Sequence, residues 1–278
     1  MLRRCDAWLH AAEDEIRLRC MIAMFAFVFA IRVAFTRFAP FARIPQALFD
    51  PPWYLHFLQS PPAVGVIIGL QILGVASALY AMVARHPKIG FVIAWCCYLV
   101  LAGLRASRGK IIHPDVIVLL ASVPLLVAPK VSWRGHNRDG RFGVPIRTSL
   151  VVVALAYFFT GYQKVVTSGL SWIGPSNLRW VLIDGSRARG VHGRALAEWI
   201  AGHNAVIVVV ASATLILEIS ALVAIVWPRY RPWFAVGVTA VHGGIWLTLN
   251  LDYSLWAATV WIVMIDWSGM ASRSLNRN

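Results

Sequence analysis

Long apolar runs separated by short polar or basic stretches recur along this chain from residue 20 to residue 268. A helix needs about 20 apolar residues to cross a hydrocarbon core of about 30 Å, and lipid offers no hydrogen-bond partner to an exposed backbone. The runs therefore predict an all-α, polytopic bundle of transmembrane helices with about eight spans, or as few as about six. The expected spans cover residues 20–38, 62–84, 90–106, 111–128, 148–168, 204–227, 232–248 and 252–270.

The segments outside the apolar runs complete the expected domain organisation. Residues 1–19 are expected to form an amphipathic helix on the membrane surface, residues 20–270 the transmembrane domain and residues 271–278 a short cytoplasmic tail. Two connections are longer than simple turns. Residues 39–61 are broken by prolines around a Trp-Tyr pair, and residues 169–203 hold a Trp/Gly/Pro stretch followed by an Arg-rich one. Both compositions are typical of a membrane interface.

The composition narrows the class of protein. Of the 278 residues, 59% are hydrophobic and 14% are charged, whereas a soluble domain carries about 25% charged residues. The net charge of +14 raises the question of nucleic-acid binding, but nucleic-acid-binding proteins concentrate basic residues on one face or tail. Here the arginines are scattered between the apolar runs, as topology and anionic headgroups require. We therefore expect membrane lipids as partners and no nucleic acid.

The distribution of Lys and Arg also predicts an orientation. If the chain crosses the membrane eight times and its N-terminus lies inside, the inner segments carry more Lys and Arg than the outer segments. Cytoplasmic loops are the ones enriched in these residues. Both termini are therefore expected in the cytoplasm, and we expect the membrane to be the inner membrane of a bacterium. The cysteines form no CxxC pair and no Cys/His spacing of the zinc type, so no metal is predicted.

Ionisable residues inside the apolar runs are the candidates for chemistry, because a charge in the hydrocarbon core is costly. Lys164 could extend its ammonium group to the interface, or it could form a desolvated amine that acts as a base. Glu218 lies in the middle of a run, so we expect it to be protonated or paired. A structural ion pair between two helices is the plain alternative. The available cationic partners are Arg32, Lys164 and, if protonated, His242.

Two histidines complete the set of candidates. His242 precedes a Gly-Gly pair that allows close approach of a helix or ligand, and histidine suits proton transfer near neutral pH. His113 opens the fourth expected span, where capping of the helix end is its plain role. In the predicted orientation, Lys164, His113 and His242 fall in the outer half of the membrane, which would form a site open to the non-cytoplasmic side if these helices touch.

The residues around Lys164 and His242 carry a family resemblance. The segment FFTGYQKVVTSGLSWIGPSNLRWVL is similar to part of the vitamin K-dependent gamma-carboxylase-like transmembrane (HTTM) domain. The later run that begins at Glu218 resembles the closing helices of that domain, with an acidic residue, then a His inside the next helix, then a polar-aromatic turn. The resemblance covers roughly residues 15–270 and lies in the order and spacing of short motifs.

The resemblance implies an enzyme of the lyase class. In the family, oxidation of a reduced quinone, vitamin K-like or menaquinone, supplies a strong base that removes a proton from substrate glutamate, and carbon dioxide then adds to the carbanion. The resemblance places the catalytic lysine at Lys164 and intramembrane histidines at His242 and His113. The residues that it implies for cofactor binding are Gly161, Tyr162 and Trp172.

This chain departs from full carboxylases, which carry an extensive soluble portion after the helices, because it ends soon after its last expected span. We therefore expect a short bacterial member that acts on a small-molecule or peptide substrate, or that works with a separate soluble partner protein. A second hypothesis is a non-catalytic or accessory protein for maturation or export of a secreted peptide, with Glu218, Arg32 and Lys164 as interhelical pairs. A transporter is the third hypothesis, although we find no repeated hydropathy of the transporter kind.

Overall fold

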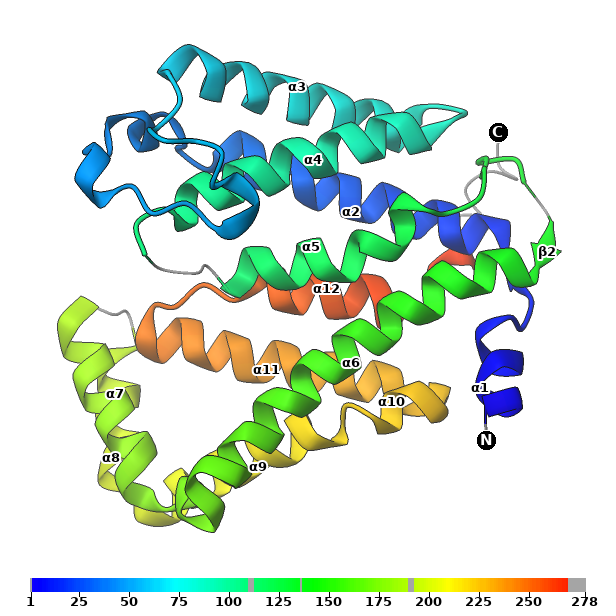
Figure 1. Ribbon diagram of the computed structural model, residues 1–278. Coiled ribbons are helices and arrows are strands. Elements are labelled where there is room, and N and C mark those ends of the chain that lie inside the picture. The colour runs from blue at the N-terminus through cyan, green and yellow to red at the C-terminus, as the bar shows by residue number, and fades with distance from the viewer. Residues whose placement is uncertain (1, 110–112, 136, 190–192, 270–278) are drawn as a thin grey trace. The chain divides into compact units, whose positions relative to one another are not determined.

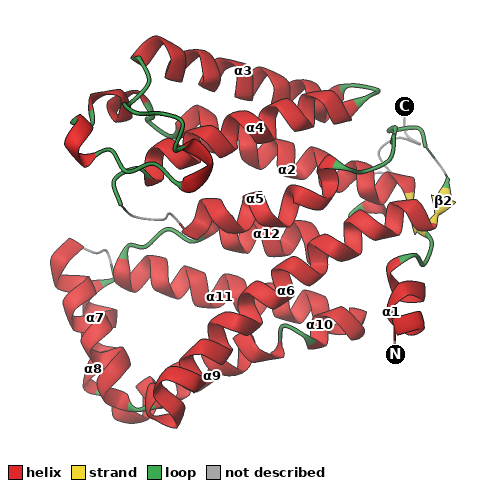
Figure 2. Ribbon diagram, in the orientation of Figure 1, coloured by secondary structure: helices red, strands yellow, loops and turns green. Residues whose placement is uncertain are grey.

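A computed structural model of the chain shows that helices make up nearly all of its regular structure (Figures 1 and 2). The predicted cytoplasmic tail, residues 271–278, lies outside the described residues. The residues that the structure describes are 2–109, 113–135, 137–189 and 193–269.

The chain forms two compact units. Unit 1 comprises Met1–Ser149 together with Asp266–Asn278, and unit 2 comprises Leu150–Ile265. Helix α6 (Gly140–Ser168) is continuous across the boundary between them.

Within the described residues, five helices are long and apolar enough to cross a membrane, or six if a pair bent by 105° counts as one broken span. The prediction of an all-α membrane protein is confirmed, with five or six candidate spans. Two further helices, α5 (His113–Leu126) and α12 (Ser254–Met264), are apolar but shorter. The bent pair is α8 (Arg194–Gly202) and α9 (Asn204–Ser220). The five long candidates are α2 (Glu15–Phe35), α3 (Val64–Val83), α4 (Pro87–Ala106), α6 with the following turn (Gly140–Ile173) and α11 with the preceding turn (Pro228–Leu249).

Unit 1 is built on helices α2, α3 and α4, which pack against one another, while α5 lies against α4 and α2. Helix α4 begins with Pro87, at a position where the missing N–H costs no hydrogen bond. Aromatic rings fill the space between α2 and α4: the ring of Phe29 lies 5.6 Å from that of Phe91 and 5.3 Å from that of Tyr98. This buried aromatic core holds the two helices together.

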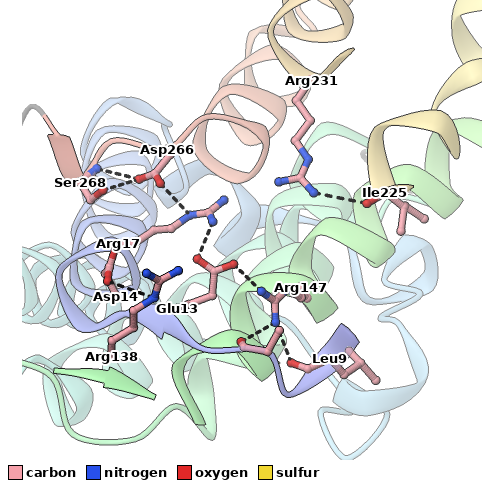
Figure 3. A network of polar contacts seen from close by, with 11 residues as sticks. Leu9, Glu13, Asp14, Arg17, Arg138, Arg147, Ile225, Arg231, Asp266 and Ser268 are labelled. Carbon is pink, nitrogen blue, oxygen red and sulfur yellow. Dashed lines mark hydrogen bonds and ion pairs between the residues drawn. The ribbon is translucent and has the colours of Figure 1, made fainter. Parts of the chain in front are cut away.

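The N-terminal segment differs from the surface helix expected over residues 1–19. Helix α1 covers only Leu2–Leu9, and a two-residue strand β1 (Glu13–Asp14) pairs antiparallel with β2 (Arg138–Asp139) before α2 begins. In this segment the carboxylate of Glu13 accepts hydrogen bonds from Arg17 at 2.8 Å and from Arg147 at 2.6 Å (Figure 3). These contacts tie the segment between α1 and α2 to the first turn of α2 and to α6.

The proline-rich connection after α2 consists of short 3-10 helices: η1 (Ala39–Arg43), η2 (Gln46–Leu48) and η3 (Trp53–Leu55). The last of these docks on α4 at Gly103. A Cβ added there would lie 2.6 Å from Leu55 Cδ1, so a larger residue would require the Leu55 side chain to move.

Unit 2 contains the remaining helices. After α6 come the 3-10 turn η4 (Gly169–Ile173) and α7 (Pro175–Arg189), and α7 packs on α8 and also contacts α9 and α11 (Arg231–Leu249). Helix α11 ends at Leu249, and the next residue, Asn250, closes the last turn with a left-handed backbone (φ 52°). Helix α11 packs against α12. A short helix α10 (Val223–Val226) and the turn η5 (Pro228–Tyr230) join α9 to α11. The connection expected over residues 169–203 is therefore mostly helical.

Candidate functional site

The centre of the candidate site is an ion pair between Lys164 on α6 and Glu218 on α9. The Lys164 Nζ donates to Glu218 Oε1 at 2.6 Å and to Oε2 at 2.7 Å. The two side chains are 22% and 12% exposed, so the pair is mostly withdrawn from the surface of unit 2. Of the partners that the sequence left open for Glu218, the structure selects Lys164.

Trp172 covers the lysine. Its ring centre lies 4.3 Å from the Lys164 Nζ, which is a cation–π contact. Gly169 makes this approach possible, because its positive φ of 56° turns the chain sharply between the end of α6 and η4. Trp172 therefore lies against the ammonium group of Lys164.

Gly161 allows α6 and α9 to approach closely beside the pair. A Cβ added at Gly161 would lie 2.9 Å from Glu218 Cβ and 3.0 Å from Ile219 Cγ1. Gly161 precedes Lys164 by three residues, so both lie on the same face of α6. Its role in the structure is to let the two helices meet, so that a short glutamate can reach the lysine.

Tyr162 points elsewhere. Its side chain is 51% exposed, and its ring stacks on that of Phe158 at a centroid distance of 6.0 Å. Phe159 also lies beside it, at 6.5 Å. Tyr162 thus contributes to an exposed aromatic surface of α6 and is not in the group of residues that surrounds the lysine ammonium.

His242 on α11 contacts the same face of α6 through Tyr157. The His242 Nε2 and the Tyr157 hydroxyl are 3.0 Å apart, which is a hydrogen bond in which either group can donate. The imidazole also stacks on Tyr253 at 5.2 Å and lies 6.1 Å from the ring of Trp256. Two buried polar atoms in this group, His242 Nδ1 and Trp256 Nε1, have no hydrogen-bond partner among the described residues.

The spacing of residues along α6 connects the two groups. Tyr157, Gly161 and Lys164 are separated by four and three residues, so they lie on one face over two helical turns. Two turns correspond to about 10 Å along the axis. The His242 group and the Lys164–Glu218 pair therefore follow one another along a single face of α6.

This arrangement can move a proton within the pair. Desolvation penalises two separated charges, and a lysine and a glutamate in contact can also exist as a neutral amine beside a neutral acid. Transfer of one proton from the Lys164 Nζ to Glu218 produces that neutral form without any exchange with water. Glu218 thus gives the lysine a route to the form that accepts a proton from a substrate.

Arg32 belongs to a different cluster, within unit 1. Its Nε donates to Asp115 Oδ1 at 2.9 Å, the Arg105 Nη1 donates to Asp115 Oδ2 at 3.1 Å, and the Tyr98 hydroxyl donates to Oδ1 at 2.8 Å. The Asp115 side chain is only 3% exposed. The interpretation of Arg32 as a partner for Glu218 is therefore wrong, because Arg32 forms its ion pair with Asp115.

Asp115 was not singled out from the sequence. It follows His113 and Pro114, and an acidic residue in the first turn of a helix is common because it favours the positive end of the helix dipole. The signal that could have found it is charge balance, since Arg32 in an apolar run needs an acidic partner. The sequence alone did not show that Arg32 and Asp115 lie close together in the fold.

His113 begins α5 in unit 1, and its side chain is exposed. Within unit 2, the structure brings Lys164, Glu218, Trp172 and Gly161 together. Sequence reasoning missed three aromatic residues around His242, namely Tyr157, Tyr253 and Trp256. Aromatic residues are frequent in the apolar helices of this chain, so the sequence gave no reason to choose these three.

The described residues contain no group of three or more His, Cys, Asp or Glu side chains that could hold a metal ion. In comparisons with known proteins, no protein-family model, no curated protein and no solved structure matches this chain.

Proposed function

We propose that this chain is an integral membrane enzyme of the carboxylase-like type, in which Lys164 is a base for a lipid-soluble substrate such as a reduced quinone. The observation that carries the proposal is the Lys164–Glu218 contact, with Nζ within 2.7 Å of both carboxylate oxygens. A lysine in this setting has a carboxylate that can take its proton. Trp172 and the aromatic rings around His242 supply the apolar surroundings that a quinone ring requires.

The residues near the pair fit a quinone in their chemistry. Buried polar groups are nearly always hydrogen-bonded, yet the Trp256 N–H donor and the His242 Nδ1 have no partner among the described residues. A hydroxyl or carbonyl oxygen on an apolar ring is the kind of group that satisfies both. When bound, a reduced quinone supplies a weakly acidic O–H group and two reducing equivalents. Lys164, as the neutral amine, would accept the proton of that group, while Glu218 keeps the proton that it took from the lysine, so the resulting ammonium would face the quinone anion.

The proposal includes eight spans, with both termini in the cytoplasm of a bacterium. Adding α5 and α12 to the six candidates gives this number, although their lengths of 14 and 11 residues require extension by neighbouring residues or a locally thinner bilayer. Arginines before and at the start of α6, among them Arg134, Arg138 and Arg141, support a cytoplasmic position for that connection. Labelling of single cysteines introduced into each connection, with a membrane-impermeant reagent, tests the count and the orientation.

The test of the enzymatic proposal is oxygen-dependent oxidation of reduced menaquinone by the full chain in nanodiscs. We expect wild-type protein to accelerate it at least about tenfold over empty nanodiscs, a modest effect for a positioned base. Lys164→Ala should abolish the acceleration while the helical content stays native. Arg229→Ala, at an exposed position of unit 2, is the matched loss of one positive charge and should retain full activity.

A binding measurement keeps this proposal testable if oxidation needs a further substrate. Quenching of tryptophan fluorescence by menaquinone reports binding directly, and Trp256→Phe should weaken it by removing the unpartnered N–H. Menaquinone that binds wild type, Trp256→Phe and Lys164→Ala with equal affinity would refute the quinone site.

A second candidate function is a non-catalytic membrane protein that assists the maturation or export of a secreted peptide. The observation that favours it is the close approach of α6 and α9 at Gly161, since an ion pair at such a contact also serves to hold two helices together. Under this reading, Lys164→Ala loses folded protein before it loses any activity. A stable, folded Lys164→Ala protein without quinone oxidation supports the enzyme instead.

A further inference from the structure

Unit 1 holds a cavity of about 310 Å³ where α4 begins and α5 ends. Its walls come from three segments: the turn into α4, the chain that leaves α5, and one residue of α2. Apolar side chains form its interior, and basic side chains stand at its edge. Among the lining residues are Ile22, His86, Lys88, Leu125, Lys130 and Val131.

The two lysines of this cavity carry uncompensated charge. The Lys88 Nζ donates to the backbone carbonyl oxygen of Ala128 at 3.0 Å, a contact that leaves its positive charge intact, and Lys130 is exposed. In the part of the chain that the structure describes, neither lysine forms an ion pair with a carboxylate. The cavity edge therefore has a net positive charge.

A larger neighbouring cavity of unit 1 shows the contrast. It has a volume of about 520 Å³ and its lining includes His10 and Arg141. There Arg141 donates to Asp139 Oδ2 from both Nε and Nη2, each at 3.1 Å, and His10 lies 3.2 Å from a carboxylate oxygen of Asp6. Its basic groups already have acidic partners, so it has no comparable surplus of charge.

Arg19 holds the chain segment that leads into the smaller cavity. It lies one helical turn before Ile22 on α2. The buried Arg19 guanidinium donates to the carbonyl oxygens of Met82 at 2.7 Å and Ala84 at 3.2 Å, and it lies 4.1 Å from the ring centre of Trp133. Its Nε and Nη1 have no hydrogen-bond partner among the described residues. Arg19 thus holds the turn before α4 against α2 and adds further positive charge beside the cavity.

We propose that this cavity binds the phosphate headgroup of an anionic phospholipid. Basic pockets between transmembrane helices are suited to such headgroups, and about 310 Å³ is at the lower end of ligand sites. The phosphate lies at the edge of the cavity, where the two lysines stand, and the acyl chains run along apolar surface. Ile89 and Val127, which are 69% and 81% exposed, provide that surface next to the cavity. Lys88 and Lys130 contact the phosphate.

The proposal concerns unit 1 and does not depend on the chemistry of Lys164. Its test is the preference of the full chain for phosphatidylglycerol over phosphatidylcholine, measured by native mass spectrometry on protein extracted from vesicles that contain equal amounts of both lipids. The test variant is Lys88→Gln/Lys130→Gln. The matched control is Arg85→Gln/Arg134→Gln, which removes two positive charges at exposed positions of the same unit that do not line the cavity.

We expect the preference for phosphatidylglycerol to fall about tenfold in the lysine variant and less than about twofold in the arginine control, since each basic residue near a headgroup contributes a substantial share of the attraction. Lys88→Arg/Lys130→Arg should keep the preference, and circular dichroism checks that all variants are folded. Equal losses in the lysine and arginine variants would overturn the proposal, because surface charge alone would then explain binding. Displacement of the bound lipid by millimolar inorganic phosphate would also overturn it, since the ligand would then be a free phosphate.

Discussion

Two groups of charged residues lie in apolar helices of this protein, and they balance their charge differently. In unit 2, one lysine meets one glutamate, so the pair of Lys164 and Glu218 is neutral as a whole. In unit 1, the single carboxylate of Asp115 is shared by Arg32 and Arg105, so that cluster carries a net positive charge.

The difference separates a group that can do proton chemistry from one that cannot. A lysine can give its proton to the adjacent carboxylate, whereas an arginine guanidinium keeps its proton under all conditions relevant to a protein. Asp115 is therefore held as a carboxylate, with a tyrosine hydroxyl as a third donor. We infer that the unit 1 cluster is structural and that chemistry belongs to the pair in unit 2.

The largest effect on stability is expected for Asp115→Asn. This change leaves Arg32 and Arg105 side by side without a compensating charge, which should cost about 4 kcal/mol of unfolding free energy. Titration of the protein in mixed micelles with sodium dodecyl sulfate measures it. Asp6→Asn, at an exposed position of α1, is the control and should change little. A loss below about 1 kcal/mol for Asp115→Asn would contradict the structural role, because it would mean that the cluster is hydrated.

The next effect is expected for the Lys164–Glu218 pair. Lys164→Met and Glu218→Gln each remove one partner and should each cost about 2–3 kcal/mol, because a mostly buried charge remains alone. The double variant should cost clearly less than the sum, since it leaves no isolated charge. The same micelle titration gives the coupling energy. Strictly additive losses would show that the two side chains do not interact in the folded protein.

The sequence was sufficient to predict an all-α protein with several apolar helices of membrane length, and the charged residues inside apolar runs. Apolar runs of about 20 residues carry that information locally, because each run must satisfy its own backbone in lipid. The runs could not predict the breaks. In the segment between α1 and α2, Glu13 is bound by Arg147, a residue far away in the sequence, and no local pattern encodes such a contact.

The partners of the charged residues were also beyond the sequence. Arg32, Lys164 and Glu218 were each recognisable by the cost of a charge in an apolar run, but their pairing depends on which helices meet. Gly161 decides this for Glu218, since its missing side chain allows the approach of α9. A glycine in an apolar helix can serve several roles, so its role as the contact point between α6 and α9 is visible only in the folded unit.

A smaller effect is expected at Gly161, and it tests whether the close approach of α6 and α9 supports the pair. Gly161→Ala places a methyl group 2.9 Å from Glu218 Cβ, so the helices must move apart at a cost of about 1–2 kcal/mol. Gly243→Ala is the matched control, because open space surrounds that position on α11. There the alanine should stabilise the protein slightly, by about 0.5 kcal/mol, through its better helix propensity. Equal effects at both glycines would mean that the contact at Gly161 is not tight.

The smallest effect is expected for Tyr157→Phe, which removes only the hydrogen bond between Tyr157 and His242 Nε2. One such bond contributes about 1 kcal/mol, and the aromatic contacts of the ring with Phe234 and Trp256 remain. The variant should therefore fold normally while the ring nitrogens of His242 change their NMR chemical shifts. If His242 belongs to the same functional face of α6 as Lys164, quinone oxidation should fall several-fold with intact folding. Unchanged oxidation together with shifted nitrogen signals would limit the site to the lysine pair, and the comparison between the two units would then rest on that pair alone.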